Sequence, residues 1–512
     1  MPNTCTRLLP HSSHSPNSVR LRLVLCANWL VVASTSSALQ AQAPGAAAAD
    51  PIKIGNITVS GSLRSRLYFW DWFQPAAGNN NYQYSGNVFR ISLSESRDTW
   101  DWKAEFALPF LLAMPSNATG TGPQQGALGL GANYASANSG KQNAAMIFAK
   151  QLYLRLDGLA GNREHTLQIG RFEFADGSEL TPKNATLAAL KRDRIAQRLI
   201  GAFGFTDVGR SFDGLHYAYG TARDNFTFVG AIPTRGVFQV DGWGWNRVAF
   251  AYTAYTHEWG HNRHAADTRL FFFEYDDFRH ILKTDNRLLS TRRADLANIR
   301  IDTFAGHSVH AFETNAGTAD LLFWGAVQTG RWGVQAQRAA AFDIEGGFQP
   351  KTFSKAKPWL RSGFTYGSGD GNANDNTHGT FFQLLPTPRT YARFPFFNMM
   401  NNEDLYGILL LRPNANLTVS SEFHSLRLAN RNDLWYSGGG AFQPWTFGYT
   451  GRSASAARSL ASLYDTQLDY RLNRSVSLTA YLGYAQGLAA MEQIYSKGKD
   501  GRFGYLELFY RF

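Results

Sequence analysis

The chain has 512 residues, a formal net charge of +11 and a mean hydropathy of −0.29, which is too hydrophilic for a bundle of membrane-spanning helices. Aromatic residues make up 14% of the chain and glycine occurs 48 times, a composition that suits many strands joined by polar loops. The two cysteines, Cys5 and Cys26, both lie near the N-terminus, which excludes a small disulfide-stapled fold.

The first 43 residues have the pattern of a secretory signal peptide. Arginines precede the apolar stretch LVLCANWLVVA, and small residues follow it. We therefore expect cleavage between Ala38 and Ala43, a linker over residues 44–56 and a mature domain over residues 57–512. For an exported basic protein, acidic glycans, small anions and lipid phosphates are favoured over nucleic acid as partners.

Alternation of apolar and polar residues dominates the mature domain. It runs through NVFRISLSES (87–96), WDWKAEFAL (100–108), QLYLRLDG (151–158) and LYDTQLDYRL (463–472). A period of two residues predicts strands, and about 18 of them can be counted from residue 57 onward. By itself, this pattern would also suit a soluble sandwich with one wet face.

The connections between these strands alternate in length. Tight links are expected at residues 96–99, 158–163, 220–224, 412–416 and 472–475. Long connections are expected at residues 71–85, 109–146, 175–211, 233–246, 367–402, 429–459 and 486–501. A soluble sandwich does not require short connections to alternate with long ones along the chain. We therefore predict an all-β fold: a single transmembrane antiparallel up-and-down β-barrel of about 18 strands, with short periplasmic turns and long extracellular loops.

Residues 182–198, PKNATLAALKRDRIAQR, break the β pattern and predict a short helix inside the long loop 175–211. Four basic residues crowd this segment: Lys191, Arg192, Arg194 and Arg198. Either they form a solvated helix face, or the loop dips toward the pore and presents positive charge there.

His257, Glu258 and His261 match the H-E-x-x-H pattern of zinc metalloproteases. That site needs a helix, because only there do two histidines four residues apart converge on one ion. The preceding NRVAFAYTAYT alternates as a strand, and Gly260 lies inside the motif. We expect residues 257–267 to form a turn at the barrel rim, without a catalytic metal or a cofactor.

Three segments resemble recurring blocks of the alginate export family. They are RLIGAFGFTDVGRSFDGLHY (198–217), TRLFFFEYDDFRHILKTDNR (268–287) and KPWLRSGFTYGSGDGNANDNTHGTFFQLLPT (357–387). The block VGRSFDG is the most distinctive, and the similarity runs from about Ile54 to Phe512. The resemblance implies an 18-stranded monomeric barrel that lets acidic exopolysaccharide leave the cell through an arginine-lined constriction.

Basic residues on the polar phase of the strands are candidate pore residues. If the apolar phase faces lipid, the lumen receives Arg64, Arg66, Arg90, Lys103, Arg155, Arg361 and Arg471. Candidates at the base of the inward loop are Arg198, Arg210 and Asp213. Clustered guanidinium groups in a low-dielectric wall concentrate anions and pair bidentately with carboxylates. Alternatively, each could be neutralised by a lumen acid such as Glu105, Asp157 or Asp469.

These patterns predict a channel in the outer membrane of a Gram-negative-type bacterium that passes anionic, alginate-like exopolysaccharide by diffusion. A general or small-solute anion porin is the alternative, and an outer-membrane hydrolase or secreted metalloprotease is a third hypothesis. The expected partners are acidic polysaccharide, outer-membrane lipid and periplasmic export components. We expect no nucleic acid, and a monomer.

Overall fold

The computed structural model describes residues 52–122, 125–261 and 263–512. The predicted signal peptide, residues 1–43, and the beginning of the predicted linker lie outside the described residues. The described part of the linker contains β1 (Ile52–Ile54), which pairs antiparallel with the start of the next strand, β2 (Ile57–Asp71).

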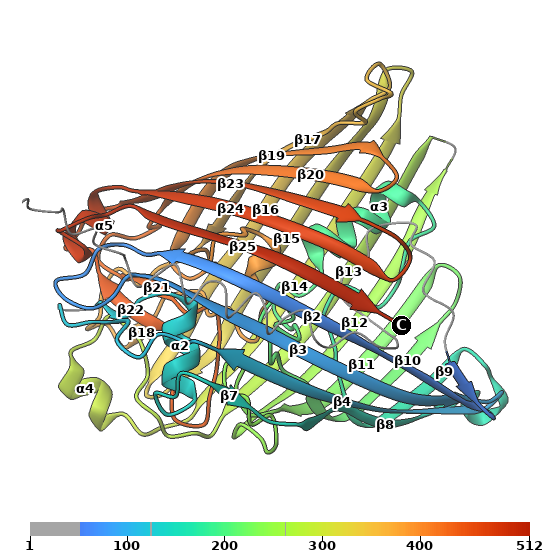
Figure 1. The fold of residues 1–512 in the computed structure, drawn as a ribbon, viewed down its shortest axis with the longest axis horizontal. Coiled ribbons are helices and arrows are strands. Elements are labelled where there is room, and N and C mark those ends of the chain that lie inside the picture. Colours follow the sequence, from blue (N-terminus) through green and yellow to red (C-terminus); the bar gives the residue numbers. More distant parts are fainter. Residues whose placement is uncertain (1–51, 123–124, 262) are drawn as a thin grey trace, which may run out of the picture. The chain divides into compact units, whose positions relative to one another are not determined.

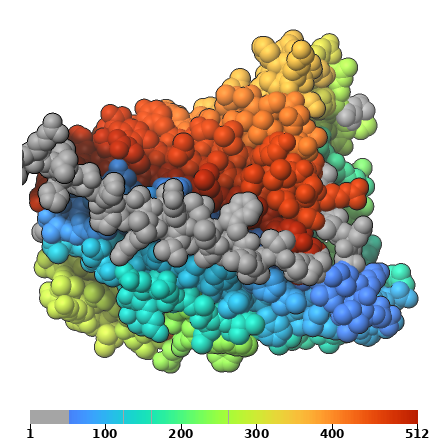
Figure 2. Space-filling view, viewed as in Figure 1, coloured from blue at the N-terminus to red at the C-terminus, as the bar shows by residue number. Residues whose placement is uncertain are grey.

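Eighteen antiparallel strands close into a barrel, as predicted (Figure 1). Each wall strand pairs with the next along the chain, and the last one, β25 (Gly501–Arg511), pairs with β2. Figures 1 and 2 show these C-terminal strands (red) beside the N-terminal strands (blue). Closure leaves no unpaired edge in the wall, which is the condition for β-structure in a bilayer.

The sixteen wall strands between these two follow the chain in order. They are β3 (Asn81–Ser96), β4 (Trp100–Leu112), β8 (Phe148–Asp157), β9 (His165–Phe172), β10 (Phe212–Gly220), β11 (Asp224–Pro233), β12 (Val248–His261), β13 (His264–Asp277), β14 (Ile299–Glu313), β15 (Gly317–Trp332), β16 (Gln335–Pro350), β17 (Trp359–Gly367), β19 (Asn402–Asn414), β20 (Leu417–Arg427), β23 (Ser459–Arg471) and β24 (Val476–Gly487). The short strands β5 (Thr119–Gly120), β6 (Gly126–Ala127), β7 (Ala144–Ala145), β18 (Thr377–His378), β21 (Leu434–Ser437) and β22 (Thr450–Ser453) lie between wall strands along the chain.

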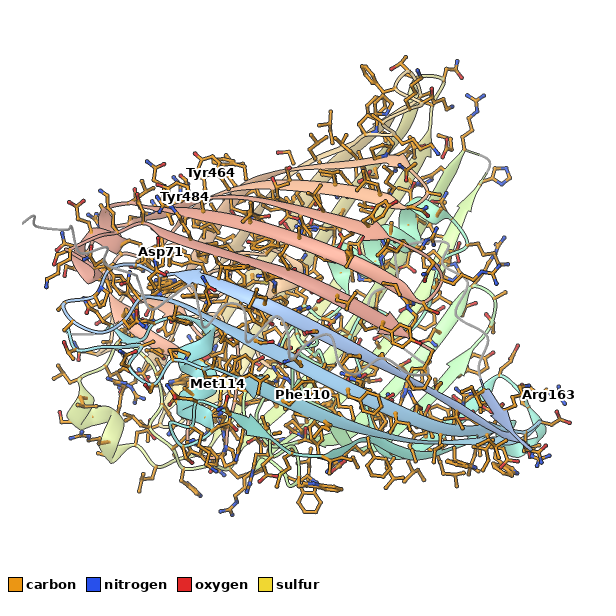
Figure 3. The ribbon with its side chains drawn as sticks, in the orientation of Figure 1. Asp71, Phe110, Met114, Arg163, Tyr464 and Tyr484 are labelled. Carbon is orange, nitrogen blue, oxygen red and sulfur yellow. The ribbon has the colours of Figure 1, made fainter. Side chains whose placement is uncertain are left out.

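Alternation along these strands separates lumen-facing from outward-facing side chains. Glu105 of β4 is fully buried on the lumen side, whereas Leu152 of β8 is 55% exposed on the outer side. The outward Tyr464 and Tyr484 stack across β23 and β24 with ring centroids 6.4 Å apart (Figure 3). The predicted sorting of the two phases is confirmed, and it gives the barrel an apolar outer surface with aromatic rings.

The connections are sorted between the two rims as predicted. One rim carries the turns 97–99, 158–164, 221–223, 314–316, 351–358, 415–416 and 472–475, together with the hairpin end where His261 of β12 pairs with His264 of β13. The other carries the loops 72–80, 113–147, 173–211, 234–247, 278–298, 368–401, 428–458 and 488–500. Four connections differ from the expectation: the loop 278–298 and the turns 314–316 and 351–358 are missing from the predicted sets, and a two-residue turn, 333–334, joins β15 to β16 on the long-loop rim.

The helices lie in the long loops: α2 (Leu130–Ala137), α3 (Ala185–Leu190), α4 (Leu289–Ala294) and α5 (Ala489–Ile494). The helix predicted within 182–198 is confirmed as α3, which a π-helical turn extends over Lys191–Ile195. Asn184 caps it, because its side-chain oxygen accepts from Thr186 N at 3.0 Å. Among the residues that the structure covers, no helix is long and apolar enough to cross a membrane.

Three long loops, 173–211, 368–401 and 428–458, meet inside the barrel. Ile200 and Leu385 form a parallel bridge between the first two, with Leu385 N donating to Leu199 O at 2.8 Å. The Tyr449 hydroxyl of the third donates to Gln383 O at 2.5 Å. The loop around α3 therefore lies inward, as one of the two alternatives expected, but the positive charge that this alternative placed in the pore is paired with carboxylates at Lys191, Arg192, Arg194 and Arg198.

The H-E-x-x-H motif corrects one expectation. It lies within strand β12 and not in a turn, because β12 pairs with β13 residue for residue as far as His261 opposite His264. On a strand, two residues four apart lie about 13 Å apart. Glu258 also points to the opposite face from His257, whose Nδ1 lies 2.7 Å from Asp224 Oδ1. This arrangement lacks the helical convergence that a zincin site requires.

The direction of the barrel in the membrane can be tested by cysteine labelling. Ser136→Cys in α2 places an exposed thiol on the long-loop rim, and Asn162→Cys places one in a short turn. We expect an impermeant maleimide to label Ser136→Cys on intact cells and Asn162→Cys only after lysis. The reverse result would invert the topology. Gly439 is a poor site for this purpose, because it is buried and has a φ of +63°.

Candidate functional site

The candidate site is the lumen, where the inward loops meet the charged faces of the wall strands. Seven of the predicted pore residues lie on the lumen side of their strands: Arg64, Arg66, Arg90, Lys103, Arg155, Arg361 and Arg471. Arg198 and Arg210 lie in the inward loop 173–211 and are buried. Asp213 is placed differently.

Arg64 and Arg66 hold the tip of the inward loop against β2. Arg64, which is 1% exposed, donates to Thr206 O at 2.6 Å and to Gly204 O at 2.8 Å, and it pairs with Asp207 at 3.1 Å. Arg66 donates to Phe205 O and to the Glu507 carboxylate. Both guanidinium groups therefore bind carbonyl and carboxylate groups of the protein itself, and these contacts position the loop.

The other end of the same loop is fixed to β16, on a distant part of the wall. Arg194 Nε donates to Glu345 at 2.8 Å, and Arg198 Nη2 donates to Asp343 at 2.6 Å. Glu345 also accepts from Arg361 Nη2 at 2.6 Å. The loop therefore crosses the lumen. The charges of Arg194, Arg198 and Arg361 are neutralised by Asp343 and Glu345 where the loop is anchored to the wall.

The predicted cations of the β3–β8 wall are also paired. Glu105 lies 2.8 Å from Lys103 Nζ and 3.2 Å from Arg90 Nη1. Arg155 pairs with Asp101 at 2.5 Å and with Asp157 at 3.2 Å. For these residues the structure shows the alternative interpretation, in which a lumen salt bridge stabilises the wall.

Asp213 faces outward and not into the lumen. Strand β10 begins at Phe212, which points inward, so Asp213 shares the outer face with Leu215. Its two oxygens accept from Arg171 Nε and Nη2, both at 2.7 Å, and one also accepts from the exposed Trp245. Asp213 therefore belongs to an ionic contact on the outer surface.

Two guanidinium groups on the inward loops have no carboxylate within salt-bridge distance among the described residues. Arg210 is 2% exposed, donates to Pro386 O at 3.2 Å and Gly440 O at 3.0 Å, and lies over the ring of Phe203. Burial lowers the pKa of Arg210 to about 9, so the group stays charged at neutral pH. Arg389 lies 3.8 Å from the ring centre of Phe205, and its two terminal nitrogens have no hydrogen-bond partner within the part of the chain that the structure describes.

Two more arginines without a carboxylate within salt-bridge distance among the described residues lie near the short-turn ends of β23 and β25. Arg471 of β23 donates to Ala415 O at 3.0 Å, and Arg511 of β25 lies over the ring of Phe509. Arg389 packs against the middle of the same wall, 4.7 Å from the ring centre of Tyr481. We call Arg210, Arg389, Arg471 and Arg511 the uncompensated arginines. The sequence-based predictions missed Arg389 and Arg511. Arg511 could have been found, because it alternates onto the same face of the last strand as Glu507. Arg389 could not, because it lies in a loop without periodicity.

Comparison with known proteins agrees with this architecture. Residues 125–486, more than half of the chain, match the alginate export family model. OccK9 (OpdG) of Pseudomonas aeruginosa aligns with a TM-score of 0.55 at 11% identity, covering 89% of this chain and 98% of that one. OccAB2 of Acinetobacter baumannii (0.54, 9%) and a BenF-like porin from Pseudomonas fluorescens Pf-5 (0.53, 8%) align over the same shares.

These structural similarities establish the fold alone, and no curated protein matches the chain. The family assignment depends on the sequence match, which includes the distinctive block VGRSFDG and the inward loops. The chain is an outer-membrane β-barrel channel and belongs to the alginate export family.

Proposed function

We propose that the barrel passes acidic exopolysaccharide through its lumen by diffusion, as a monomer and without a cofactor. The observation that carries this proposal is the set of uncompensated arginines, in a lumen where most other cations are paired. Membership of the alginate export family supports the choice of an acidic polymer. Outer-membrane lipid would surround the apolar outer face, and periplasmic export components would deliver the polymer.

Positive charge in this setting acts on a passing polyanion without binding it permanently. Two unit charges about 4 Å apart interact by about 4 kcal/mol at an effective dielectric constant near 20. As the polymer moves, each of its carboxylates would leave one arginine and approach the next. The polymer therefore stays attracted to the lumen, although no single contact holds it in place. The paired arginines contribute differently, because they fix the loops that narrow the lumen.

A small-solute anion porin is the second candidate, and the packing of the interior favours it. The three inward loops bury large side chains such as Phe381, Phe382 and Phe442 inside the barrel. A lumen filled in this way would pass a small carboxylate more easily than a polymer. The two candidates share the uncompensated arginines and differ in the size of the solute that they admit.

Conductance of the purified barrel in a planar bilayer separates these candidates. The polymer channel should prefer anions and be blocked by hexuronate oligomers, because their carboxylates would occupy several guanidinium groups at once. A porin should prefer anions but conduct equally with and without the oligomer. Indifference to the sign of the ion would contradict both proposals.

A further inference from the structure

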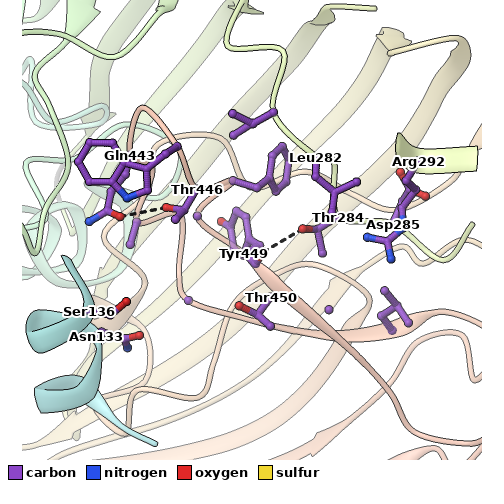
Figure 4. Close-up of a pocket in the computed structure, with 18 of the residues that line it drawn as sticks. Asn133, Ser136, Leu282, Thr284, Asp285, Arg292, Gln443, Thr446, Tyr449 and Thr450 are labelled. Carbon is purple, nitrogen blue, oxygen red and sulfur yellow. Dashed lines mark hydrogen bonds between the residues drawn. The ribbon is translucent and has the colours of Figure 1, made fainter. Parts of the chain in front are cut away.

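The long-loop rim contains a cavity of about 630 Å³ that is lined by residues of four loops (Figure 4). Asn133 and Ser136 of α2 lie on one side of it, and Asp285 and Arg292 of the loop 278–298 lie on the other. The loop 428–458 supplies Trp445 among other residues. The volume is within the range of small-molecule sites, which is about 300–1,000 Å³.

The lining contains polar atoms that the protein does not satisfy. Arg287 is 6% exposed, and its Nη1 has no hydrogen-bond partner among the described residues. Neither does the buried Oδ1 of its neighbour Asn286. A buried donor and a buried acceptor without partners are costly, but both atoms are enclosed by the surrounding loop, so a ligand would meet this lining at the more accessible Arg292.

The charge on the α4 side of the cavity favours an anion. Both oxygens of Asp285 already accept hydrogen bonds, from Arg287 and from the Trp332 ring nitrogen. Asp295 accepts from Lys283 and Arg287. Three cations, counting Arg292, therefore face two carboxylates here, and Arg292 is the cation that has none within salt-bridge distance among the described residues.

Arg292 is oriented by its own loop and needs no carboxylate to hold it. Its Nε donates to Arg287 O at 3.2 Å and its Nη1 to Lys283 O at 3.1 Å. These contacts leave Nη2 for an incoming group. A fixed, planar guanidinium is suited to a carboxylate, which it binds with charge-assisted hydrogen bonds.

The remaining lining has the features of a sugar site. Trp445 is 52% exposed and offers an aromatic surface for the apolar face of a pyranose ring. Thr284, Gln443 and Thr450 bring hydroxyl and amide groups that can exchange hydrogen bonds with sugar hydroxyls. Together, an aromatic surface, neutral polar groups and one available guanidinium match a hexuronate residue.

We propose that this cavity is a binding site for a hexuronate segment of a glycan at the long-loop mouth of the channel. The choice of ligand rests on the proposed function, but the site is separate from the uncompensated arginines. It would hold the polymer at the rim, so that a segment that has left the lumen does not return.

Binding of soluble oligosaccharides to the full-length barrel in detergent tests this proposal by titration calorimetry. The probes are a 1,4-linked hexuronate tetramer and a neutral hexose tetramer of the same linkage. Arg292→Gln should weaken binding of the hexuronate about tenfold and leave the neutral tetramer unchanged, because it removes one charge-assisted contact. Trp445→Ala should weaken both. The matched control is Arg293→Gln, an exposed neighbour on α4 that does not line the cavity.

Equal affinity of wild type and Arg292→Gln for the hexuronate would overturn the inference, and so would equal affinity of wild type for the two tetramers. Retention of heat-modifiable migration on gels checks that each variant is folded. Anion preference of Arg292→Gln in a bilayer should equal that of wild type. A wild-type barrel that binds the hexuronate but shows no anion preference would refute the proposed function and support the binding site. A barrel that prefers anions but does not bind the hexuronate would refute the binding site alone.

Discussion

Replacing Glu345 with glutamine is expected to loosen the attachment of the inward loop 173–211 to β16 at Arg194. Glu345 is 1% exposed and joins Arg194 of the loop to Arg361 of β17. Removing one partner of a buried ion pair costs about 3–5 kcal/mol, because the other charge stays buried. Arg361 keeps Asp320, whereas Arg194 keeps the Tyr391 carbonyl at 3.4 Å, two aromatic rings and the more distant attraction of Asp343.

We expect the barrel itself to persist, because its backbone pairing does not involve this carboxylate. Hydrogen exchange of residues 185–200 should become faster in Glu345→Gln, and single-channel conductance should rise as this part of the loop becomes more mobile. Glu313→Gln is the matched control, since this exposed carboxylate of β14 has no cation within salt-bridge distance among the described residues. Unchanged protection and conductance in Glu345→Gln would show that the loop is held by its other contacts.

Neutralising Arg210 and Arg389 together should lower the preference of the channel for anions. Neither group has a carboxylate partner, so glutamine removes charge without leaving an acid unpaired. At roughly 1 kcal/mol for each charge acting on an ion in the lumen, the permeability ratio should fall about fivefold in each single variant and further in the double variant. Block by hexuronate oligomers should weaken in parallel.

Reversal potentials in a salt gradient measure this effect, and the double variant must still show heat-modifiable migration. Arg163→Gln, in a short turn at the rim (Figure 3), removes the same charge away from the inward loops and should leave the ratio unchanged. An equal loss in Arg163→Gln and in the double variant would indicate an effect of net charge. No loss in the double variant would leave these two arginines without a role in selectivity.

The fold could be predicted from the sequence because most wall strands show the alternation of apolar and polar residues within their own segment. Alternation in β4 separates Trp102 and Phe106 from Lys103 and Glu105, and this local pattern needs no knowledge of distant residues. Loop lengths then determine which rim each connection occupies. The exception is the two-residue turn 333–334 on the long-loop rim, whereas the loop 278–298 obeys the rule and is only missing from the predicted set.

The state of the lumen could not be predicted in the same way, because it depends on partners far apart along the chain. Arg64 meets Asp207, and Arg194 meets Glu345, and no periodicity connects the members of either pair. Alternation placed Arg64 on the lumen side correctly but did not show that it would be neutralised there. Asp213, predicted as a pore residue at the base of the inward loop, lies on the outer face instead, because its face depends on the residue at which β10 begins after a long loop.

The contact between β2 and β25 also bears on how the protein is made. Every other wall strand can pair with a strand that was synthesised just before or after it, but this seam joins the two ends of the sheet, from Ser62 opposite Arg511 to Asp71 opposite Arg502. Until the seam closes, both ends present unpaired backbone groups that could recruit strands from other chains. Assembly therefore includes an interval in which both edges of the open sheet are unpaired, and that interval ends only when the final strand is in place.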